Sequence, residues 1–212
     1  MCTGRVDLSF VMRALARGAD GVIIGGCWPG ECHYVTEGNY DALGNVLIAK
    51  KMLERVGLSP DRVRIEWISA AEGARFAEVM SDFADELRQL GPIGGGEGVE
   101  PDDLELRLGA VSRLVPFVKL VEREKLRVPE KSQEAYETYF ASEEVDRLFD
   151  DLVADKLVMS RILLLLEDRP LTTAEISEAL VLEPSEVSRH MKTSSRQGLV
   201  RYDLDRKCYA LA

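Results

Sequence analysis

The stretch that most constrains the fold runs from residue 21 to residue 34. A short apolar run, Gly21-Val22-Ile23-Ile24, is typical of a buried β-strand, and a glycine- and proline-rich loop follows it directly. This loop carries Cys27 and Cys32, two of the chain's four cysteines. Ligand sites of open α/β sheets lie at the carboxyl ends of strands. A strand that ends in a loop with two thiols therefore predicts a site for a soft metal centre.

A third cysteine, Cys2, opens the chain in the run Cys2-Thr3-Gly4-Arg5-Val6-Asp7. We predict that Cys2, Cys27 and Cys32 converge on an iron–sulfur cluster. The alternative is a small-loop disulfide between Cys27 and Cys32, but the reducing cytoplasm disfavours disulfides. Iron–sulfur clusters are normally held by four protein ligands, and only three are visible nearby. Cys208 is expected to be a buried small apolar residue, whereas His33 is expected to be a hydrogen-bonding residue of the loop or a ligand.

Size and composition limit the class of protein. The chain has 212 residues, of which 46% are hydrophobic and 30% are charged, as in a soluble globular protein of one large or two modest domains. The net charge of -10 argues against nucleic-acid binding by the whole chain. The longest apolar run, Ile162 to Leu166, is far shorter than the ~20 residues of a membrane span. No signal peptide is visible, so we expect a cytoplasmic protein without membrane contact.

Helices and strands are expected to alternate in the first part of the chain. Hydrophobic spacing predicts helices over residues 8–18, 39–56 and 69–90, and strands over residues 21–25 and 62–68. This order is typical of an α/β fold with a small parallel, Rossmann- or flavodoxin-like sheet. Two strands make a poor sheet, and the first helix has no preceding strand. We therefore expect the chain to be truncated, with Met1 an internal methionine of a longer product.

The second part of the chain is predicted to be mainly helical. Residues 92–101 contain a glycine cluster that is typical of a flexible joint. Thr172 and Glu175 have the spacing of a capping box, and Asp205-Arg206 has the position of a hairpin turn after two more helices. Three helices and a hairpin form a winged helix-turn-helix. The predicted domains are 1–91 (iron–sulfur), 92–101 (linker), 102–142 (helical connector) and 143–212 (winged helix-turn-helix).

The helix that begins near Pro184 is the predicted recognition helix, because such a helix lies in the major groove of DNA. The residues expected to face DNA are Ser185, Ser188, Arg189, Lys192 and Arg196, with Arg201, Arg206 and Lys207 near the phosphates. Glu183 and Glu186 lie on the same helix and oppose phosphate binding. A protein-docking or dimerisation module is therefore the alternative.

Two segments carry a family resemblance. "CTGRVDLSFVMRALARGADGVIIGGCWPGECHYVTEGNY" and "RVRIEWISAAEGARFAEVM" resemble the delta subunit of methyl-viologen-reducing, F420-non-reducing hydrogenase, over residues 2 to about 92. The resemblance implies a cytoplasmic 2Fe–2S protein that passes electrons between a nickel–iron hydrogenase or formate dehydrogenase and the flavoprotein of heterodisulfide reductase. It matches Cys2, Cys27 and Cys32 to the family's cysteines. Trp28 departs from the pattern, because relatives commonly have histidine there.

Two functions follow as hypotheses. The first is an electron-transfer subunit of an oxidoreductase complex, with no catalytic residues of its own. The second is a redox-sensing transcription regulator, in which a cluster in the first domain controls DNA binding by Ser188, Arg189, Lys192 and Arg196. Smaller expectations concern three side chains. Arg5 would stabilise the cluster's charge or pair with Asp7, Glu72 would cap the helix after it or complement its dipole, and His190 would be partly exposed.

Overall fold

A computed structural model describes residues 2–212 of the chain. The prediction about Met1 lies outside these residues. The chain divides into two compact units, the first ending at Phe149 and the second beginning at Asp150. The division therefore falls inside the second half of the chain and not at the glycine cluster. Each unit has its own buried apolar residues, and each is described by itself below.

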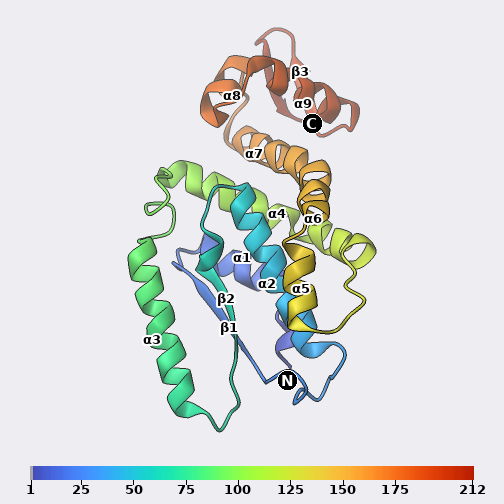
Figure 1. The fold of residues 1–212 in the computed structure, drawn as a ribbon. Coiled ribbons are helices and arrows are strands. Elements are labelled where there is room, and N and C mark those ends of the chain that lie inside the picture. The colour runs from blue at the N-terminus through green and yellow to red at the C-terminus, as the bar shows by residue number, and fades with distance from the viewer. Residues whose placement is uncertain (1) are drawn as a thin grey trace. The chain divides into compact units, whose positions relative to one another are not determined.

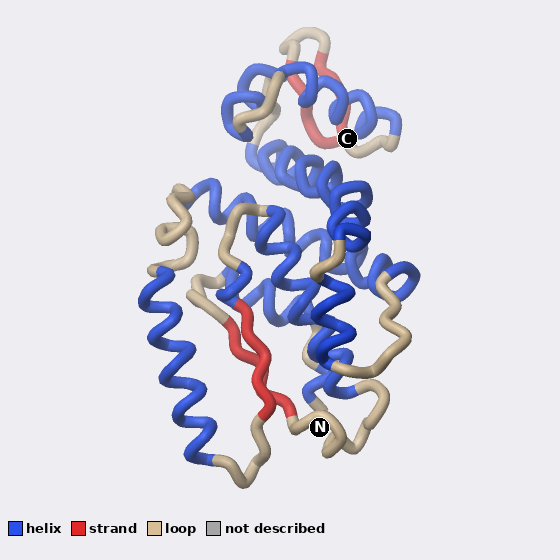
Figure 2. The backbone as a smooth tube through the Cα atoms, in the orientation of Figure 1, coloured by secondary structure: helices blue, strands red, loops and turns tan. Residues whose placement is uncertain are grey.

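The first unit is an α/β layer extended by helices (Figure 1). Strands β1 and β2 run in parallel, with Val22 opposite Val63 and Gly26 opposite Trp67. Figure 2 shows these two strands side by side in red, with helices around them. The elements are α1 (Leu8–Ala16), β1 (Val22–Gly26), α2 (Gly38–Arg55), β2 (Val63–Trp67), α3 (Gly73–Leu90), α4 (Pro101–Lys125), α5 (Gln133–Phe140) and α6 (Glu143–Phe149). The predicted α/β class is confirmed.

Helices α1 and α2 form the core of this unit. Asp7 caps α1 by accepting a hydrogen bond of 2.9 Å from the backbone N–H of Ser9. α1 packs on α4. α2 packs on β2 and on α5, and most of its apolar side chains are buried. Because α2 starts at the end of the cysteine loop, its packing fixes where that loop can lie.

Helix α3 is packed less completely than α2. Figure 1 shows it on the side of the sheet away from α1 and α2. It buries Val79 and Phe83, whereas Phe76 and Met80 of the same predicted apolar side are exposed. The helix also begins at Gly73 and not at Ser69, because residues 69–72 form a turn.

The glycine cluster after α3 is a packed turn segment and not a flexible joint. Arg62 is fully buried and donates hydrogen bonds to the backbone oxygens of Asp20, Gly91 and Pro92. Its guanidinium also binds the carboxylate of Glu97 at 2.6 and 2.9 Å. A buried guanidinium needs several acceptors, and an irregular backbone offers carbonyl groups that a helix would use internally. The sequence pattern predicted the irregular backbone but not this anchor.

The second unit has the predicted winged helix-turn-helix arrangement. A π-helical turn at Asp150–Ala154 leads into α7 (Asp155–Asp168), α8 (Thr173–Leu180) and α9 (Pro184–Arg196), followed by the antiparallel strands β3 (Val200–Asp203) and β4 (Cys208–Leu211). The capping box of Thr172 and Glu175 is formed in both directions. Across the part of the chain that the structure describes, no helix has both the length and the apolar character needed to cross a membrane.

Candidate metal centre

The structure brings the three predicted cysteines of the first unit together. Cys2 precedes the first short turn, Cys27 follows the last residue of β1, and Cys32 lies in the loop before α2. The Sγ atoms of Cys2 and Cys32 are 3.9 Å apart. Two thiolates on one tetrahedral metal, each with a bond of about 2.3 Å, would be roughly 3.8 Å apart. The spacing of Cys2 and Cys32 therefore fits two ligands of one metal atom.

Gly38, the first residue of α2, forms the floor of the thiol cluster. A Cβ atom at this position would lie 2.6 Å from the Sγ of Cys32 and 2.7 Å from the Sγ of Cys2. These distances are too short for any side chain, so only glycine leaves room for both thiols here. Sequence reasoning missed Gly38 as a site residue, and its position just before Asn39-Tyr40 in the family motif was the only signal.

Asn39 is the second site residue that sequence reasoning missed. Its side-chain oxygen accepts a hydrogen bond of 3.4 Å from the thiol of Cys27, and its side-chain nitrogen donates to the backbone oxygen of Cys27. Asn39 is buried in the first turn of α2. It thereby fixes the loop end of β1 to the start of the helix.

The thiols differ in their electrostatic surroundings. Burial alone would raise the pKa of Cys32, but hydrogen bonds from the backbone N–H groups of Tyr34 and Asn39 and from the other two thiols lower it. Burial, together with the neighbouring Cys32, raises the pKa of Cys27. The N-terminus of α2 also favours negative charge. The site is therefore arranged to hold a thiolate at Cys32, and the thiolate is the form that binds metals.

The donor set fits an iron–sulfur cluster in part. Within residues 2–212, no group of three or more histidine, cysteine, aspartate or glutamate side chains has the geometry to bind a single metal ion. The three thiols supply three of the four thiolate ligands that a cluster needs. The glycine floor leaves space beside them. His33 is exposed, and its ring meets the Tyr34 ring edge-on at 5.2 Å. Cys208 is buried in the second unit, as expected.

Trp28 ties the cysteine loop to the turn before α3. Its indole N–H donates a hydrogen bond of 2.8 Å to Glu72, and the guanidinium of Arg75 lies 5.0 Å from its ring centre. Glu72 also accepts from the backbone N–H of Ser69, and these bonds lower the pKa of its carboxyl. Glu72 stands at the N-cap position of α3, but its side chain makes no capping hydrogen bond, because the carboxylate is used by the loop. Of the two predicted roles, the side-chain cap is therefore absent, whereas a carboxylate at the start of the helix is in a position to complement the helix dipole.

Arg5 lies beside the thiols and Asp7 does not. A cavity of about 300 Å³ is lined by Cys2, Arg5, Tyr34, Glu37 and Asp41, with Gly4 and Gly38. Asp7 instead binds Lys119 of α4, and this contact lowers the pKa of Asp7 to about 2. Arg5 thus shares a cavity with Cys2, whereas Asp7 pairs with Lys119.

In the second unit, α9 presents the predicted polar residues to the surface. Ser185, Ser188, Arg189, Lys192 and Arg196 are exposed, as are Arg201, Arg206 and Lys207 of the hairpin. Arg189 forms ion pairs with Asp155 at 3.3 Å and with Glu186 at 3.9 Å. The prediction for His190 was wrong: its side chain is buried, and burial lowers its pKa.

Comparison with known proteins gives two matches in separate parts of the chain. Residues 1–91 match the family profile "Methyl-viologen-reducing hydrogenase, delta subunit". Residues 158–202 match the profile "Bacterial regulatory protein, arsR family". The second match covers the part of the chain that folds into α7, α8, α9 and β3.

Individual relatives match the first part of the chain. An F420-non-reducing hydrogenase iron-sulfur subunit of Archaeoglobus profundus is 54% identical over 92 residues, which cover 43% of this chain and 66% of the relative. One subunit of the ferredoxin/F(420)H(2)-dependent CoB-CoM heterodisulfide reductase of Methanosarcina acetivorans is 49% identical over 44% of this chain but only 12% of that protein. The vhu iron-sulfur subunit of the F420-non-reducing hydrogenase of Methanopyrus kandleri is 39% identical over 43% of this chain and 69% of the relative.

These matches agree with the geometry of the thiol cluster, which lies wholly within the matched residues. The chain covers 66% and 12% of the first two relatives, so the likeness concerns one domain of each. Because the chain covers more than two thirds of the third relative at 39% identity, it belongs to the family of the methyl-viologen-reducing hydrogenase delta subunit.

Proposed function

We propose that the chain is an iron–sulfur electron-transfer subunit. It would carry electrons between a hydrogenase or formate dehydrogenase and a flavoprotein of the heterodisulfide reductase type, in the cytoplasm. The observation that carries the proposal is the convergence of three thiols: Cys2 and Cys32 lie together over Gly38, and Cys27 contacts Cys32. The names of the relatives, which are iron-sulfur subunits of hydrogenases and one subunit of heterodisulfide reductase, support it.

The proposed cofactor is a 2Fe–2S cluster with Cys2, Cys27 and Cys32 as ligands. When bound, such a cluster supplies one-electron oxidation and reduction. The backbone N–H groups of Tyr34 and Asn39 would stabilise the negative charge at Cys32, and the buried position of Cys32 keeps water from that side. The fourth ligand would come from outside the described thiol cluster.

The same region offers a surface for a redox partner. Tyr34 and Val35 are 53% and 61% exposed, directly after the Cys32 loop. Because electron transfer needs close approach of the two centres, apolar residues beside a cluster are suited to a partner protein. The domain that would carry this role is 1–91, and residues 92–101 and 102–142 would connect it to a winged-helix domain at 143–212.

The test is anaerobic reconstitution of the full chain with iron and sulfide, in the presence of a small thiol that can supply a fourth ligand. The proposal predicts a visible absorption spectrum and a paramagnetic signal after reduction. Iron at the same level in a Cys2→Ala, Cys27→Ala, Cys32→Ala triple variant would contradict it. The control is a Cys208→Ala chain, which also lacks a thiol but should load fully.

A second candidate function, a redox-sensing transcription regulator, rests on α9. Ser188, Arg189, Lys192 and Arg196 are all exposed on this helix, and the match to the arsR-type regulators covers it. Salt-dependent binding of a defined DNA site would support a regulator. Copurification with hydrogenase or heterodisulfide reductase subunits, with no DNA binding at low salt, would favour the first function alone.

A further inference from the structure

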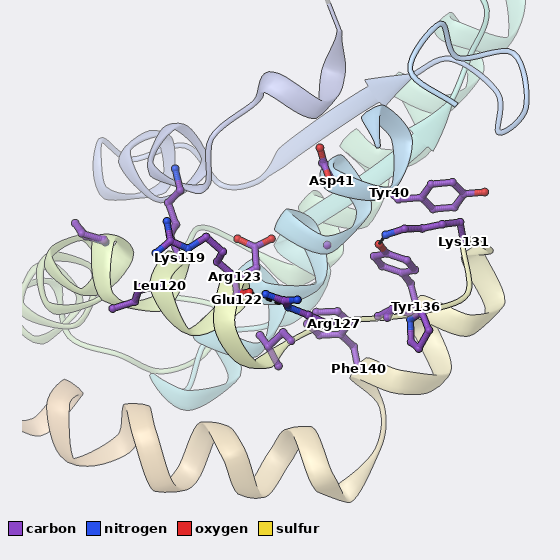
Figure 3. A pocket seen from close by; sticks show the side chains of 15 residues that line it. Tyr40, Asp41, Lys119, Leu120, Glu122, Arg123, Arg127, Lys131, Tyr136 and Phe140 are labelled. Carbon is purple, nitrogen blue, oxygen red and sulfur yellow. Dashed lines mark hydrogen bonds between the residues drawn. The ribbon is translucent and has the colours of Figure 1, made fainter. Parts of the chain in front are cut away.

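A second and larger cavity lies in the first unit, apart from the thiols. It is an open cavity of about 980 Å³, lined by α2, α4, α5 and the segment between α4 and α5 (Figure 3). The range typical of small-molecule sites is roughly 300–1,000 Å³. Its lining is Tyr40, Asp41, Gly44, Pro116, Lys119, Leu120, Glu122, Arg123, Leu126, Arg127, Val128, Pro129, Lys131, Tyr136 and Phe140. All of these except the three α2 residues lie beyond the family match at 1–91.

One side of this cavity is cationic. Lys119 and Arg123 are four residues apart and lie on one face at the end of α4, and Arg127 follows in the segment after this helix, which ends at Lys125. Arg123 uses its Nε to bind Glu124, and Arg127 uses its Nε to bind the backbone oxygen of Arg123. Among residues 2–212, the Nη atoms of Arg123 and Arg127 have no hydrogen-bond partner. Two guanidinium groups thus have donors to offer a ligand.

The carboxyl groups in the lining do not cancel this positive charge. The lining contains four cationic side chains and two carboxyl groups, those of Asp41 and Glu122. Burial raises the pKa of Glu122 and of Asp41, and each is raised further by nearby carboxylates. The cavity therefore carries a net positive charge in a chain whose net charge is -10. Such a local reversal of charge is suited to an anionic ligand.

The other side of the cavity is aromatic. The rings of Tyr40 and Tyr136 stack at 5.5 Å with an angle of 29° between their planes. The Nζ of Lys131 lies 5.2 Å from the centre of the Tyr136 ring and donates a hydrogen bond of 2.7 Å to its hydroxyl. Figure 3 shows Lys131 beside this pair, across the cavity from the α4 residues Lys119 and Arg123. Aromatic faces of this kind favour stacking with a planar ring.

We propose that this cavity binds a phosphate-bearing planar-ring compound of the nucleotide class. The ring lies against Tyr40 and Tyr136, and the phosphate accepts hydrogen bonds from Arg123 and Arg127. Arginine is suited to this role because its planar fork matches phosphate oxygens. The site is independent of the cluster, although Asp41 lines both this cavity and the smaller one beside Cys2.

Titration calorimetry on the full chain tests the proposal. The probes are FMN and AMP, with riboflavin, adenosine and inorganic phosphate as partial ligands. We expect at least one nucleotide to bind, and its phosphate-free counterpart to bind more weakly. FMN and AMP distinguish a flavin from an adenine nucleotide as the source of the shared chemistry. Inorganic phosphate alone should bind much more weakly than the nucleotide, because it cannot use the tyrosines.

Variants connect binding to the named residues. Arg123→Gln and Arg127→Gln should each weaken nucleotide binding by about tenfold, the loss of one charge-assisted hydrogen bond. Lys125→Gln is the matched control, because Lys125 lies on the same turn of α4 outside the cavity lining. These side chains are exposed, so the fold should be unaffected. Absence of binding by both nucleotides, or equal effects of Arg127→Gln and Lys125→Gln, would overturn the proposal.

Discussion

The two candidate sites of this chain are built in opposite ways. At the start of α2, polar and sulfur atoms point inward: Cys32 and Asn39 are buried, and Gly38 leaves space where any side chain would clash. On α9, the polar side chains point outward, and Arg189 shares its charge with Asp155 and Glu186 at the surface. The first arrangement is specific for one small bound group. The second is an exposed surface that only a large partner molecule could recognise.

This contrast also separates effects on stability from effects on function. Buried polar groups have fixed partners, so removing one leaves an unsatisfied group and a large cost. Exposed ion pairs contribute little to folding because water screens them. Substitutions of the buried polar groups of the first unit should therefore produce large effects, and substitutions of the exposed residues of α9 should produce small effects on folding.

The largest effect is expected from Cys32→Ala. Cys32 is the buried thiol that contacts both other cysteines, so its loss should abolish iron binding after anaerobic reconstitution. Iron and sulfide analysis per chain measures this directly. The control Cys208→Ala, in the second unit, should bind as much iron as the unaltered chain. Equal iron in both variants would remove the thiol cluster as the binding site.

A large effect is also expected from Gly38→Ala, although this change favours helix formation. The added Cβ would lie 2.6 and 2.7 Å from two sulfur atoms, so the thiols must move apart and most of the iron should be lost. Gly44→Ala is the matched control in the same helix, because its Cβ would meet its nearest neighbours at 3.7 Å. Circular dichroism should show both variants folded. Full iron loading of Gly38→Ala would show that the glycine floor has no role.

A substantial loss of stability is expected from Glu97→Gln. The change leaves the fully buried Arg62 without its carboxylate, which costs about 3 kcal/mol in the free energy of unfolding. Burial opposes the charged form of Glu97, but the bonds from Arg62 prevail and lower its pKa. A carboxyl group whose pKa is lower in the folded chain than in the unfolded chain stabilises the fold at pH values above its unfolded pKa. This stabilisation is lost as the pH falls through the folded pKa. Denaturant unfolding should therefore show a weaker acid dependence in Glu97→Gln, and an unchanged acid dependence would contradict the assignment.

The smallest effect on folding is expected from Arg189→Gln. Its ion pairs are exposed, so the free energy of unfolding should change by less than about 0.5 kcal/mol. If α9 reads DNA, the same change should weaken binding at low salt and reduce its salt dependence. Fluorescence anisotropy with a labelled DNA fragment measures both. A loss of several kcal/mol in stability would instead assign Arg189 a structural role.

Local elements could be predicted from the sequence, and tertiary partners could not. The α1 cap at Asp7, the capping box at Thr172 and the parallel strand order follow from short-range spacing. Gly38 could not be recognised as the floor of the thiol site, because its role depends on Cys2 and Cys32, which only the fold brings beside it. The hydrogen-bond partner of Glu72 and the burial of His190 could not be predicted for the same reason: Trp28 and the packing of α9 decide their surroundings.

The aromatic and cationic cavity could also not be predicted from the sequence. Its aromatic side comes from α2 and α5 and its cationic side from the end of α4, and α2 lies far from the other two helices along the chain. The spacing of Lys119, Arg123 and Arg127 has an ordinary explanation at a helix C-terminus, where basic residues complement the helix dipole. Only the fold places them opposite Tyr40 and Tyr136.

The central claim is that three cysteines of the first unit hold an iron–sulfur cluster. Electron paramagnetic resonance on the reduced, anaerobically reconstituted full chain tests it most directly, with the iron content measured on the same sample. The account predicts a signal from a one-electron-reduced cluster that disappears in Cys2→Ala, Cys27→Ala and Cys32→Ala and persists in Cys208→Ala. A chain that retains no iron, or a signal that survives in all three variants, would contradict it.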